Sequence, residues 1–298
     1  MASSSVFVGM VTHARSRFNV DGAAASMTLG LAEQLREAGL EVEVLVSDRD
    51  DYDPVAMPLR RTTLVRSAVH QAALERRWRR YLVAGGAAGR GAASDLVVQT
   101  GMAGKRVSQS IGRQPWKAAP DLPGAKAVTR LLNIDLSHLR LMAEADAYSS
   151  EWTLILEDDA GVADLALAAR QLAWLTAALS DTYVDFASLS ESLSLDELGV
   201  AELLQPAGDI PVPTNLGLVL MRATRPITNT VCATLYRTSY LRKLRASILR
   251  SGLSPVAPID WRVNEAIMDL VDQGELDEQS CVWVKPGIFL QRSMHDPA

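Results

Sequence analysis

The chain has 298 residues, 48% of them hydrophobic, and a formal net charge of −5. This length and apolar content provide for a large buried core and exclude disorder over most of the sequence. Because there is no basic excess, nucleic acid is disfavoured as a general partner, and no apolar stretch is long enough for a transmembrane helix.

The first part of the sequence predicts a strand–helix–strand unit. Residues 6–11 form an apolar run of strand length, and residues 23–38 carry apolar side chains at helical spacing. Gly39 is a typical helix stop, and residues 40–46 then alternate before they become fully apolar. A strand, a helix and a second strand in this order favour a parallel, right-handed unit.

The middle of the sequence is less regular. Residues 62–82 predict a helix with a basic band, which either faces solvent or contacts anionic lipid at a membrane surface. The band consists of Arg76, Arg77, Arg79 and Arg80. Residues 84–92 are too rich in glycine for a helix and predict a mobile loop. Residues 100–123 are polar and irregular, and a loop of this length predicts a lid that closes over a ligand.

The remaining sequence alternates between predicted helices and strands. Helices are expected at residues 125–147, 163–179, 191–199, 237–251 and 261–271, and strands at residues 152–156, 183–187, 216–221, 230–236 and 281–284. No linker divides the chain, so we expect one domain, residues 1–298, with an α/β fold in which helices flank a Rossmann-like, mixed but mostly parallel sheet. Cys232 and Cys281 lack metal-ligand spacing and are expected to be free, buried thiols in a reducing compartment.

Three consecutive carboxylates follow the apolar run at residues 152–156. They are Glu157, Asp158 and Asp159. The carboxyl end of a strand is where open α/β sheets bind ligands, and clustered carboxylates are costly to bury without a positive partner. A hard divalent cation held together with phosphate oxygens is such a partner, so the triplet predicts a Mg²⁺ or Mn²⁺ site. The alternative is that two of these side chains are solvated and the third caps the next helix.

The triplet belongs to a longer pattern. Asp135-Leu-Ser-His138 lies on the predicted helix upstream, and the run Leu-Ile-Leu-Glu-Asp-Asp-Ala ends at Ala160. Over residues 133–160 the chain resembles glycosyltransferase family 25, which includes lipopolysaccharide, lipooligosaccharide and collagen galactosyltransferases. Members of that family usually carry Asn-Leu-Asp-Arg after the first strand, whereas this chain has Val-Thr-His-Ala-Arg-Ser-Arg at residues 11–17.

The resemblance implies a fold of the GT-A type and metal-dependent transfer from a nucleotide-sugar donor, with inversion at the sugar carbon. In such folds an acidic pair at this strand end bridges the metal to the diphosphate, which points to Asp158 and Asp159, with Glu157 as a third ligand or a supporting group. A late histidine sometimes completes the metal site, and His295 is the candidate here. The alternative is that His295 is a frayed residue near the chain terminus.

Sugar transfer also needs residues that hold the nucleotide. The loops after the first two strands are the expected cradle in a doubly wound sheet. The candidates for contacts with phosphate, ribose or base are Thr12, Arg15, Arg17, Asp48, His138 and Asp158. For any one of the loop residues, plain solvation is the alternative. For His138, the alternative is a packing residue of its helix.

The acceptor hydroxyl needs a general base. Asp260, which follows Pro258 and opens a predicted helix, is the first candidate, and Glu191 is the second. The alternative for Asp260 is a helix N-cap, a position that Asp favours without any catalytic role.

The leading hypothesis is a metal-dependent glycosyltransferase that uses Mn²⁺ or Mg²⁺ and a nucleotide sugar, with UDP-sugars as the first choice. Its acceptor would be a glycan, a glycolipid or a cell-envelope precursor, including a lipid-linked one. Two alternatives stay open: a metal-dependent hydrolase or phosphotransferase, and a non-catalytic nucleotide-binding or assembly protein with the same fold. We expect a cytoplasmic protein, with peripheral contact at the inner face of the membrane and homo-oligomerisation as open questions.

Overall fold

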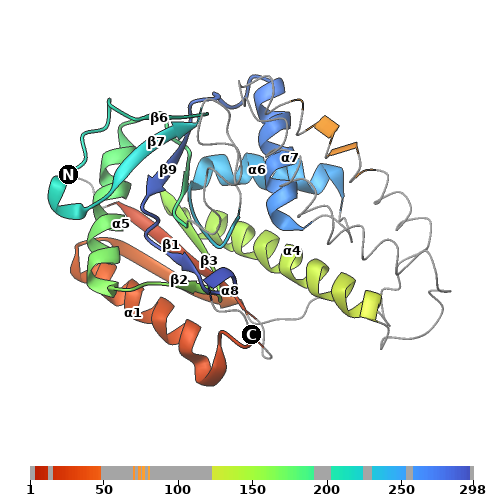
Figure 1. The fold of residues 1–298 in the computed structure, drawn as a ribbon, viewed down its shortest axis with the longest axis horizontal. Helices are drawn as coiled ribbons and strands as arrows, with labels where there is room; N and C mark the ends of the chain where they lie inside the picture. Colours follow the sequence, from red (N-terminus) through yellow and green to blue (C-terminus); the bar gives the residue numbers. More distant parts are fainter. Residues whose placement is uncertain are drawn as a thin grey trace.

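A mixed eight-stranded sheet in the order β2-β1-β3-β8-β5-β9-β7-β6 forms the centre of the molecule (Figure 1). The computed structural model describes residues 4–12, 16–47, 70, 73–74, 76–77, 80, 123–190, 203–223, 230–252 and 258–295. In sheet order the strands are β2 (Glu41–Ser47), β1 (Ser5–Val11), β3 (Trp152–Glu157), β8 (Ala233–Arg237), β5 (Phe186–Ser188), β9 (Cys281–Lys285), β7 (Val219–Ala223) and β6 (Leu204–Pro206). Only β7 and β8 run against the other strands, so the expected mixed, mostly parallel α/β sheet is confirmed.

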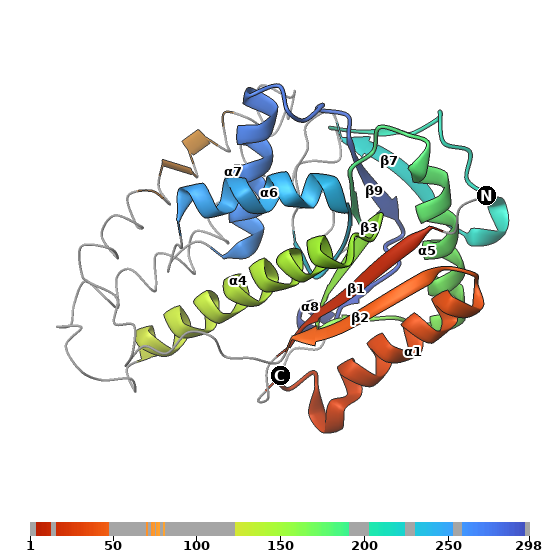
Figure 2. The same cartoon turned by 180° about the vertical axis from the view of Figure 1, so that it is seen from behind.

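Helices cover both faces of this sheet. Helices α1 (Ala23–Glu37) and α5 (Leu165–Ser180) pack together on one face. Figure 2 shows α4 (Pro123–Tyr148), α6 (Thr238–Ser251) and α7 (Ile259–Asp272) together on the other face. Because side chains alternate along a strand, β1 supplies apolar residues to both cores, which explains why its sequence is an uninterrupted apolar run.

The connection from β1 to β2 and the connection from β2 to β3 place their helices on opposite faces of the sheet. Helix α1 links β1 to β2 on the first face, whereas α4, which precedes β3, lies on the second. Strands β2 and β3 pair with β1 from opposite sides, both in parallel. The point between β1 and β3 is therefore a topological switch point, and the carboxyl ends of these two strands border the crevice where such sheets bind ligands.

Most predicted elements are present, with shifted ends. Helix α7 begins at Ile259 with Pro258 at its N-cap, so Asp260 lies in the first turn and is not the N-cap that the sequence pattern suggested. Strand β5 begins three residues later than predicted, at Phe186. The tail after β9 contains two short elements that were not predicted, β10 (Leu290–Gln291) and α8 (Arg292–His295). Elements this short carry no periodicity that a sequence can reveal.

Several expectations fall on residues that the structure does not describe. The predicted mobile loop at residues 84–92, the helix at residues 191–199 and the lid at residues 100–123, apart from its last residue, lie outside the described residues. Both cysteines are buried and free, as expected. Within the described ranges, no helix combines the length and the apolar character needed to cross a membrane.

The predicted basic band around residues 76–80 makes a contact that the sequence did not suggest. Arg77 forms ion pairs with Asp269 at 2.5 Å and with Asp272 at 2.7 Å, both on α7. Its charge is thus balanced within the protein, which weakens the idea of a lipid-binding band. Arg76 and Arg80 are exposed.

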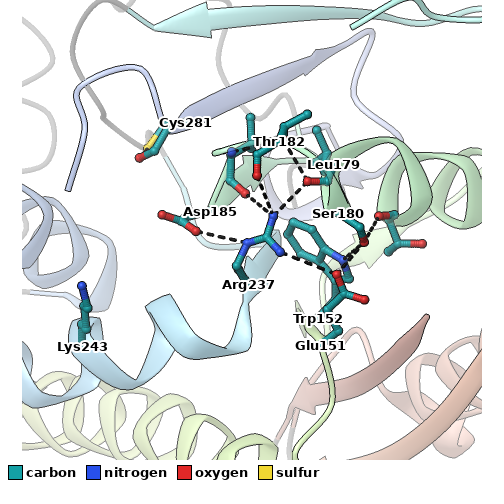
Figure 3. Close-up of polar contacts among 12 residues, drawn as sticks. Glu151, Trp152, Leu179, Ser180, Thr182, Asp185, Arg237, Lys243 and Cys281 are labelled. Carbon is teal, nitrogen blue, oxygen red and sulfur yellow. Dashed lines mark hydrogen bonds and ion pairs between the residues drawn. The ribbon is translucent and has the colours of Figure 1, made fainter. Parts of the chain in front are cut away.

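The amino end of β3 is held by Arg237, the last residue of β8 (Figure 3). One guanidinium nitrogen of Arg237 donates to the backbone carbonyls that end α5 and follow it, those of Leu179 (2.9 Å), Thr182 (3.1 Å) and Val184 (3.2 Å). The guanidinium also lies 4.6 Å from the ring centre of Trp152 and pairs with Asp185 at 3.2 Å. A cation among the carbonyls at a helix C-terminus is stabilising. This cluster lies at the opposite end of β3 from the acidic triplet. A substitution of Arg237 can therefore serve as a control that affects the fold but not the acidic triplet.

Candidate functional site

The acidic triplet lies beside the end of β1, at the switch point. Val11, the last residue of β1, pairs with Glu157, the last residue of β3. Thr12 then donates a hydrogen bond from Oγ1 to Oδ2 of Asp158 (2.8 Å) and another from its backbone N–H to the carbonyl of Ser47 (2.9 Å). The carboxyl ends of β2, β1 and β3 are therefore joined at one edge of the sheet, with the carboxylates among them.

Each carboxylate of the triplet contacts a different part of the fold. Oε1 of Glu157 lies 3.1 Å from Nε2 of His138 on α4. Asp158 is bonded to Thr12, whereas Oδ2 of Asp159 accepts from Nε2 of Gln291 (3.1 Å) and from the hydroxyl of Ser293. The sequence pattern suggested three side chains that converge on one cation, and the structure instead distributes them over three elements.

The segment Leu290–Ser293 forms one wall of this acidic turn. Strand β10 pairs with β4 (Ala160–Gly161), directly after the triplet. The backbone N–H of Arg292 donates to the carbonyl of Asp159 (2.8 Å), and its guanidinium donates to the carbonyls of Asp158 (2.8 Å) and Phe18 (3.0 Å). Arg292 thus links the loop after β1 to the turn after β3.

Positive charge surrounds the acidic turn on its loop side. The guanidinium groups of Arg17 and Arg292 lie 4.6 Å and 5.3 Å from the ring centre of Phe18. The buried thiol of Cys232 lies near the negative charge of the triplet. Burial and the carboxylates of Asp159 and Glu157 raise the pKa of this thiol well above its usual value. Carboxylates and guanidinium groups are thus close together, as a site for a cation and a phosphate requires.

A fourth carboxylate approaches the triplet from α7. The pKa of Asp260 is raised to about 6, mainly by burial and also by the charge of Glu157, while the N–H of Trp261, bonded to Oδ1 at 2.9 Å, opposes the rise. His138 is fully buried on the same side, and Glu157 is its only hydrogen-bond partner among the described residues. Its position supports the packing interpretation more than a direct contact with a ligand.

A buried ion pair supports this side of the site, and the sequence analysis gave it no role. Asp135 of α4 and Arg262 of α7 are buried, with Nη1 of Arg262 3.0 Å from Oδ2 of Asp135. Arg262 also donates to the carbonyls of Ile248 (2.8 Å) and Gly252, at the end of α6. An arginine and an aspartate on the apolar stripes of two predicted helices were the available signal, since such charges are rarely buried unless they are paired.

The remaining candidates lie outside the described part of the chain. Arg15, Asp48 and Glu191 are not among the described residues. His295 ends α8, which follows the segment bonded to Asp159, but its side chain is not described either. Trp261, the neighbour of Asp260 in the first turn of α7, is described and is buried.

The donor groups around the acidic turn decide whether it can hold a metal ion. In the described ranges, no group of three or more histidine, cysteine, aspartate or glutamate side chains is arranged to hold a metal ion. Oδ1 of Asp159 is buried and has no hydrogen-bond partner among the described residues, and carboxylate oxygens of this kind suit hard cations. The donor chemistry of Asp158 and Asp159 therefore fits a divalent cation whose other ligands are phosphate oxygens or water.

No protein-family model and no curated protein matches the chain. The resemblance to glycosyltransferase family 25 therefore rests on residues 133–160 alone.

Proposed function

We propose that this protein is a metal-dependent glycosyltransferase with a GT-A type fold, which transfers a sugar from a nucleotide-diphosphate donor to a hydroxyl of a glycan, glycolipid or cell-envelope acceptor. The observation that carries the proposal is the position of the acidic turn. Glu157, Asp158 and Asp159 lie at the carboxyl end of β3, at the switch point and in hydrogen-bond contact with the residue after β1. Ligands of open α/β sheets bind at this place.

The residues around the turn have distinct roles in this proposal. Asp158 and Asp159 would hold Mn²⁺ or Mg²⁺, which would neutralise the leaving diphosphate when it is bound. Arg17, on the loop after β1, would pair with phosphate, since guanidinium groups bind phosphate through two parallel hydrogen bonds. His138 would act through Glu157, because it is buried against that carboxylate.

Asp260 would be the general base for the acceptor hydroxyl. A base that acts near neutral pH needs a pKa close to the operating pH, and burial raises the pKa of Asp260 to about 6. The charge of Glu157 acts on Asp260, so the proposed base and the proposed donor site are neighbours. The triplet follows the end of β3, and Asp260 lies at the start of α7. Catalytic groups of α/β enzymes commonly come from different strand and helix ends in this way.

One observation favours the alternative of a non-catalytic nucleotide-binding or assembly protein. Every carboxylate of the triplet already has a partner within the protein, so the turn is stable without a ligand. A turn that only fixes the C-terminal segment would have the same contacts.

Calorimetric titration separates the two functions. We expect the full chain to bind UDP or GDP in the presence of Mn²⁺ and to lose at least about tenfold in affinity when EDTA removes the metal. CMP, which lacks a diphosphate, serves as the control nucleotide and should show no metal linkage. If none of the three nucleotides binds, with or without Mn²⁺, the proposed transferase activity is contradicted. A non-catalytic assembly protein then remains as the alternative.

Asp260→Asn tests the assignment of the base. The variant should bind the nucleotide and metal with affinities within about twofold of the wild type, because Asp260 does not touch the donor in this proposal. Its kcat for nucleotide-sugar turnover should fall by about 100-fold or more, the usual contribution of a general base. In the wild type, kcat should rise with pH through about 6, where the carboxyl loses its proton. Asp272→Asn, at the other end of α7, is the control, and an unchanged kcat in Asp260→Asn would remove the assignment.

A further inference from the structure

Three consecutive residues near the end of the chain hold Asp159, the last carboxylate of the acidic turn. Nε2 of Gln291 donates to Oδ2 of Asp159 at 3.1 Å, and the hydroxyl of Ser293 donates to the same oxygen. Between these two residues, the backbone N–H of Arg292 donates to the carbonyl of Asp159 at 2.8 Å. The C-terminal segment, residues 290–293, is therefore attached to both the backbone and the carboxylate of Asp159.

The two oxygens of the Asp159 carboxylate have different surroundings. Asp159 is only 7% exposed, and both side-chain donors of the C-terminal segment reach Oδ2, whereas neither reaches Oδ1. The buried thiol of Cys232 also interacts with this carboxylate, but a thiol is only a weak donor. An amide and a hydroxyl donor on one oxygen fix the orientation of the whole carboxylate, and Oδ1 is the oxygen that remains for a further ligand.

The C-terminal segment lies closely against the turn after β3. A Cβ atom at Gly161 would meet Cγ and Cδ of Arg292 at 3.1 Å, so glycine at this position permits the close approach. The guanidinium group of Arg292 donates to the carbonyls of Asp158 (2.8 Å) and Phe18 (3.0 Å). The segment thus bridges the acidic turn and the loop after β1, and its attachment depends on the geometry of both.

We propose that Gln291 and Ser293 are positioning residues of the cation site, and that attachment of the C-terminal segment is coupled to cation binding at Asp159. The cation itself rests on the function proposed above, and the coupling adds a way in which that site is regulated. Residues that orient a metal ligand through hydrogen bonds commonly change metal affinity by about 10–100-fold when they are removed. Coupling between two binding events is reciprocal, so a bound cation also stabilises the attached segment.

The competing explanation is that the C-terminal segment only anchors the last part of the chain on the turn after β3. In that case the hydrogen bonds to Oδ2 of Asp159 contribute to stability, but the cation affinity does not depend on them. Cation affinity and thermal stability, measured on the same variants, therefore separate the two explanations.

Titration of the full chain with Mn²⁺ alone, followed by electron paramagnetic resonance of the free ion, tests the proposal without nucleotide. The test variant is Gln291→Met combined with Ser293→Ala, which removes both side-chain donors and keeps the backbone bond of Arg292. The wild type should bind Mn²⁺, and the affinity of the test variant should be lower by about tenfold or more. Ser293→Thr retains a hydroxyl donor and should bind Mn²⁺ within about twofold of the wild type. If the test variant does not fold, Ser293→Ala alone takes its place and should lose about threefold or more.

Gln171→Met is the matched control. Gln171 is buried on α5, and its Nε2 donates to the carbonyl of Leu216 at 2.7 Å. The replacement removes one amide hydrogen bond, as Gln291→Met does, but in a contact that does not involve the acidic turn. It should lower the melting temperature by about 2–4 °C and leave Mn²⁺ affinity unchanged.

The reverse effect of the cation on the fold is measured by heating. A ligand that binds only the folded protein raises its melting temperature, and the rise grows with the affinity of the ligand. At one Mn²⁺ concentration, the rise should be smaller in the test variant than in the wild type, whereas Gln171→Met should show the same rise as the wild type.

Three results would overturn the proposal. They are absence of Mn²⁺ binding by the wild type, equal Mn²⁺ affinity of wild type and test variant, and an equal loss of affinity in Gln171→Met, which would show general destabilisation. The transferase itself is judged by the nucleotide titration described above. Metal-linked nucleotide binding that is equal in wild type and test variant would contradict the coupling and leave the transferase, whereas the expected Mn²⁺ results without any nucleotide binding would do the reverse.

Discussion

Replacing Asp158 with asparagine is expected to weaken Mn²⁺-linked nucleotide binding by about 100-fold or more. Groups that only support metal ligands already change metal affinity by about 10–100-fold, and a direct ligand should exceed that. The replacement is nearly isosteric, and its amide oxygen can still accept the hydrogen bond from Oγ1 of Thr12. The variant thus removes the charge while keeping the contact between β1 and β3, and calorimetric titration with UDP and Mn²⁺ measures the effect.

Two control variants separate loss of the site from loss of the fold. Arg237→Met removes the guanidinium that bonds three carbonyls at the end of α5, at the opposite end of β3. It should lower the melting temperature and leave nucleotide affinity unchanged. Asp146→Asn removes an exposed carboxylate that pairs with Arg242 and should change neither property. If Asp158→Asn binds UDP and Mn²⁺ like the wild type, the acidic turn is not a metal site.

Asp159 is expected to behave differently from Asp158. Its Oδ2 is bonded by Gln291 and Ser293, so Asp159→Asn would alter the contact with the C-terminal segment as well as the charge. The two aspartates, adjacent in sequence, are thus not equivalent, because one contacts the loop after β1 and the other the chain terminus. No sequence pattern distinguishes them.

The location of the candidate site could be predicted from the sequence, but its contacts could not. The apolar run at residues 152–156 predicted a central strand, and the general rule for α/β sheets placed the ligand at its carboxyl end, where the triplet lies. The partners of the triplet are far away in the chain: Thr12 is 146 residues from Asp158, and Gln291 is 132 residues from Asp159. Such contacts depend on the packing of the whole fold, which local periodicity does not encode.

Small errors in element boundaries had larger consequences for the site. The predicted strand at residues 183–187 starts three residues before β5 and stops one residue before its end, so the sequence misplaced the residues that pair with β8 and β9. Similarly, the N-cap rule fitted Asp260 only because the predicted helix began too late, whereas Pro258 occupies the cap. The carboxylate of Asp260 still accepts the N–H of Trp261 in the first turn of α7, so the proposed role as a base is additional to this contact.

The largest expected loss of stability follows from replacing Arg262 with methionine. Arg262 and Asp135 form a fully buried ion pair, and Arg262 also bonds carbonyls at the end of α6, so one side chain joins α4, α6 and α7. Removing Arg262 leaves the buried carboxyl of Asp135 either charged without a partner or protonated, and breaking such a pair costs about 3–5 kcal/mol in the free energy of unfolding. Urea denaturation at neutral pH measures this difference.

The double variant Asp135→Asn with Arg262→Met should recover part of the lost stability, because no buried charge remains unpaired. Arg242→Ala, which breaks the exposed pair with Asp146, is the control and should change the urea midpoint little. Should Arg262→Met fail to fold, Arg262→Lys keeps the charge but loses the fork of hydrogen bonds, and it should be intermediate. Equal stability of wild type and Arg262→Met would contradict the assignment of this pair as the support of the site.

The loss of stability in Arg262→Met has two possible causes, the broken ion pair and the lost packing of the arginine stem. The pH dependence of stability distinguishes them. Burial raises the pKa of Asp135 from 3.8 to about 7, while the charge of Arg262 opposes the rise. Between these two values the folded protein binds more protons at Asp135 than the unfolded chain, so its stability falls as the pH rises through this window. In Arg262→Met the opposing charge is gone, the pKa of Asp135 rises further, and the fall in stability should extend to higher pH. In the double variant, which has no carboxyl at position 135, this contribution should disappear, whereas a loss caused by packing alone would be the same at every pH.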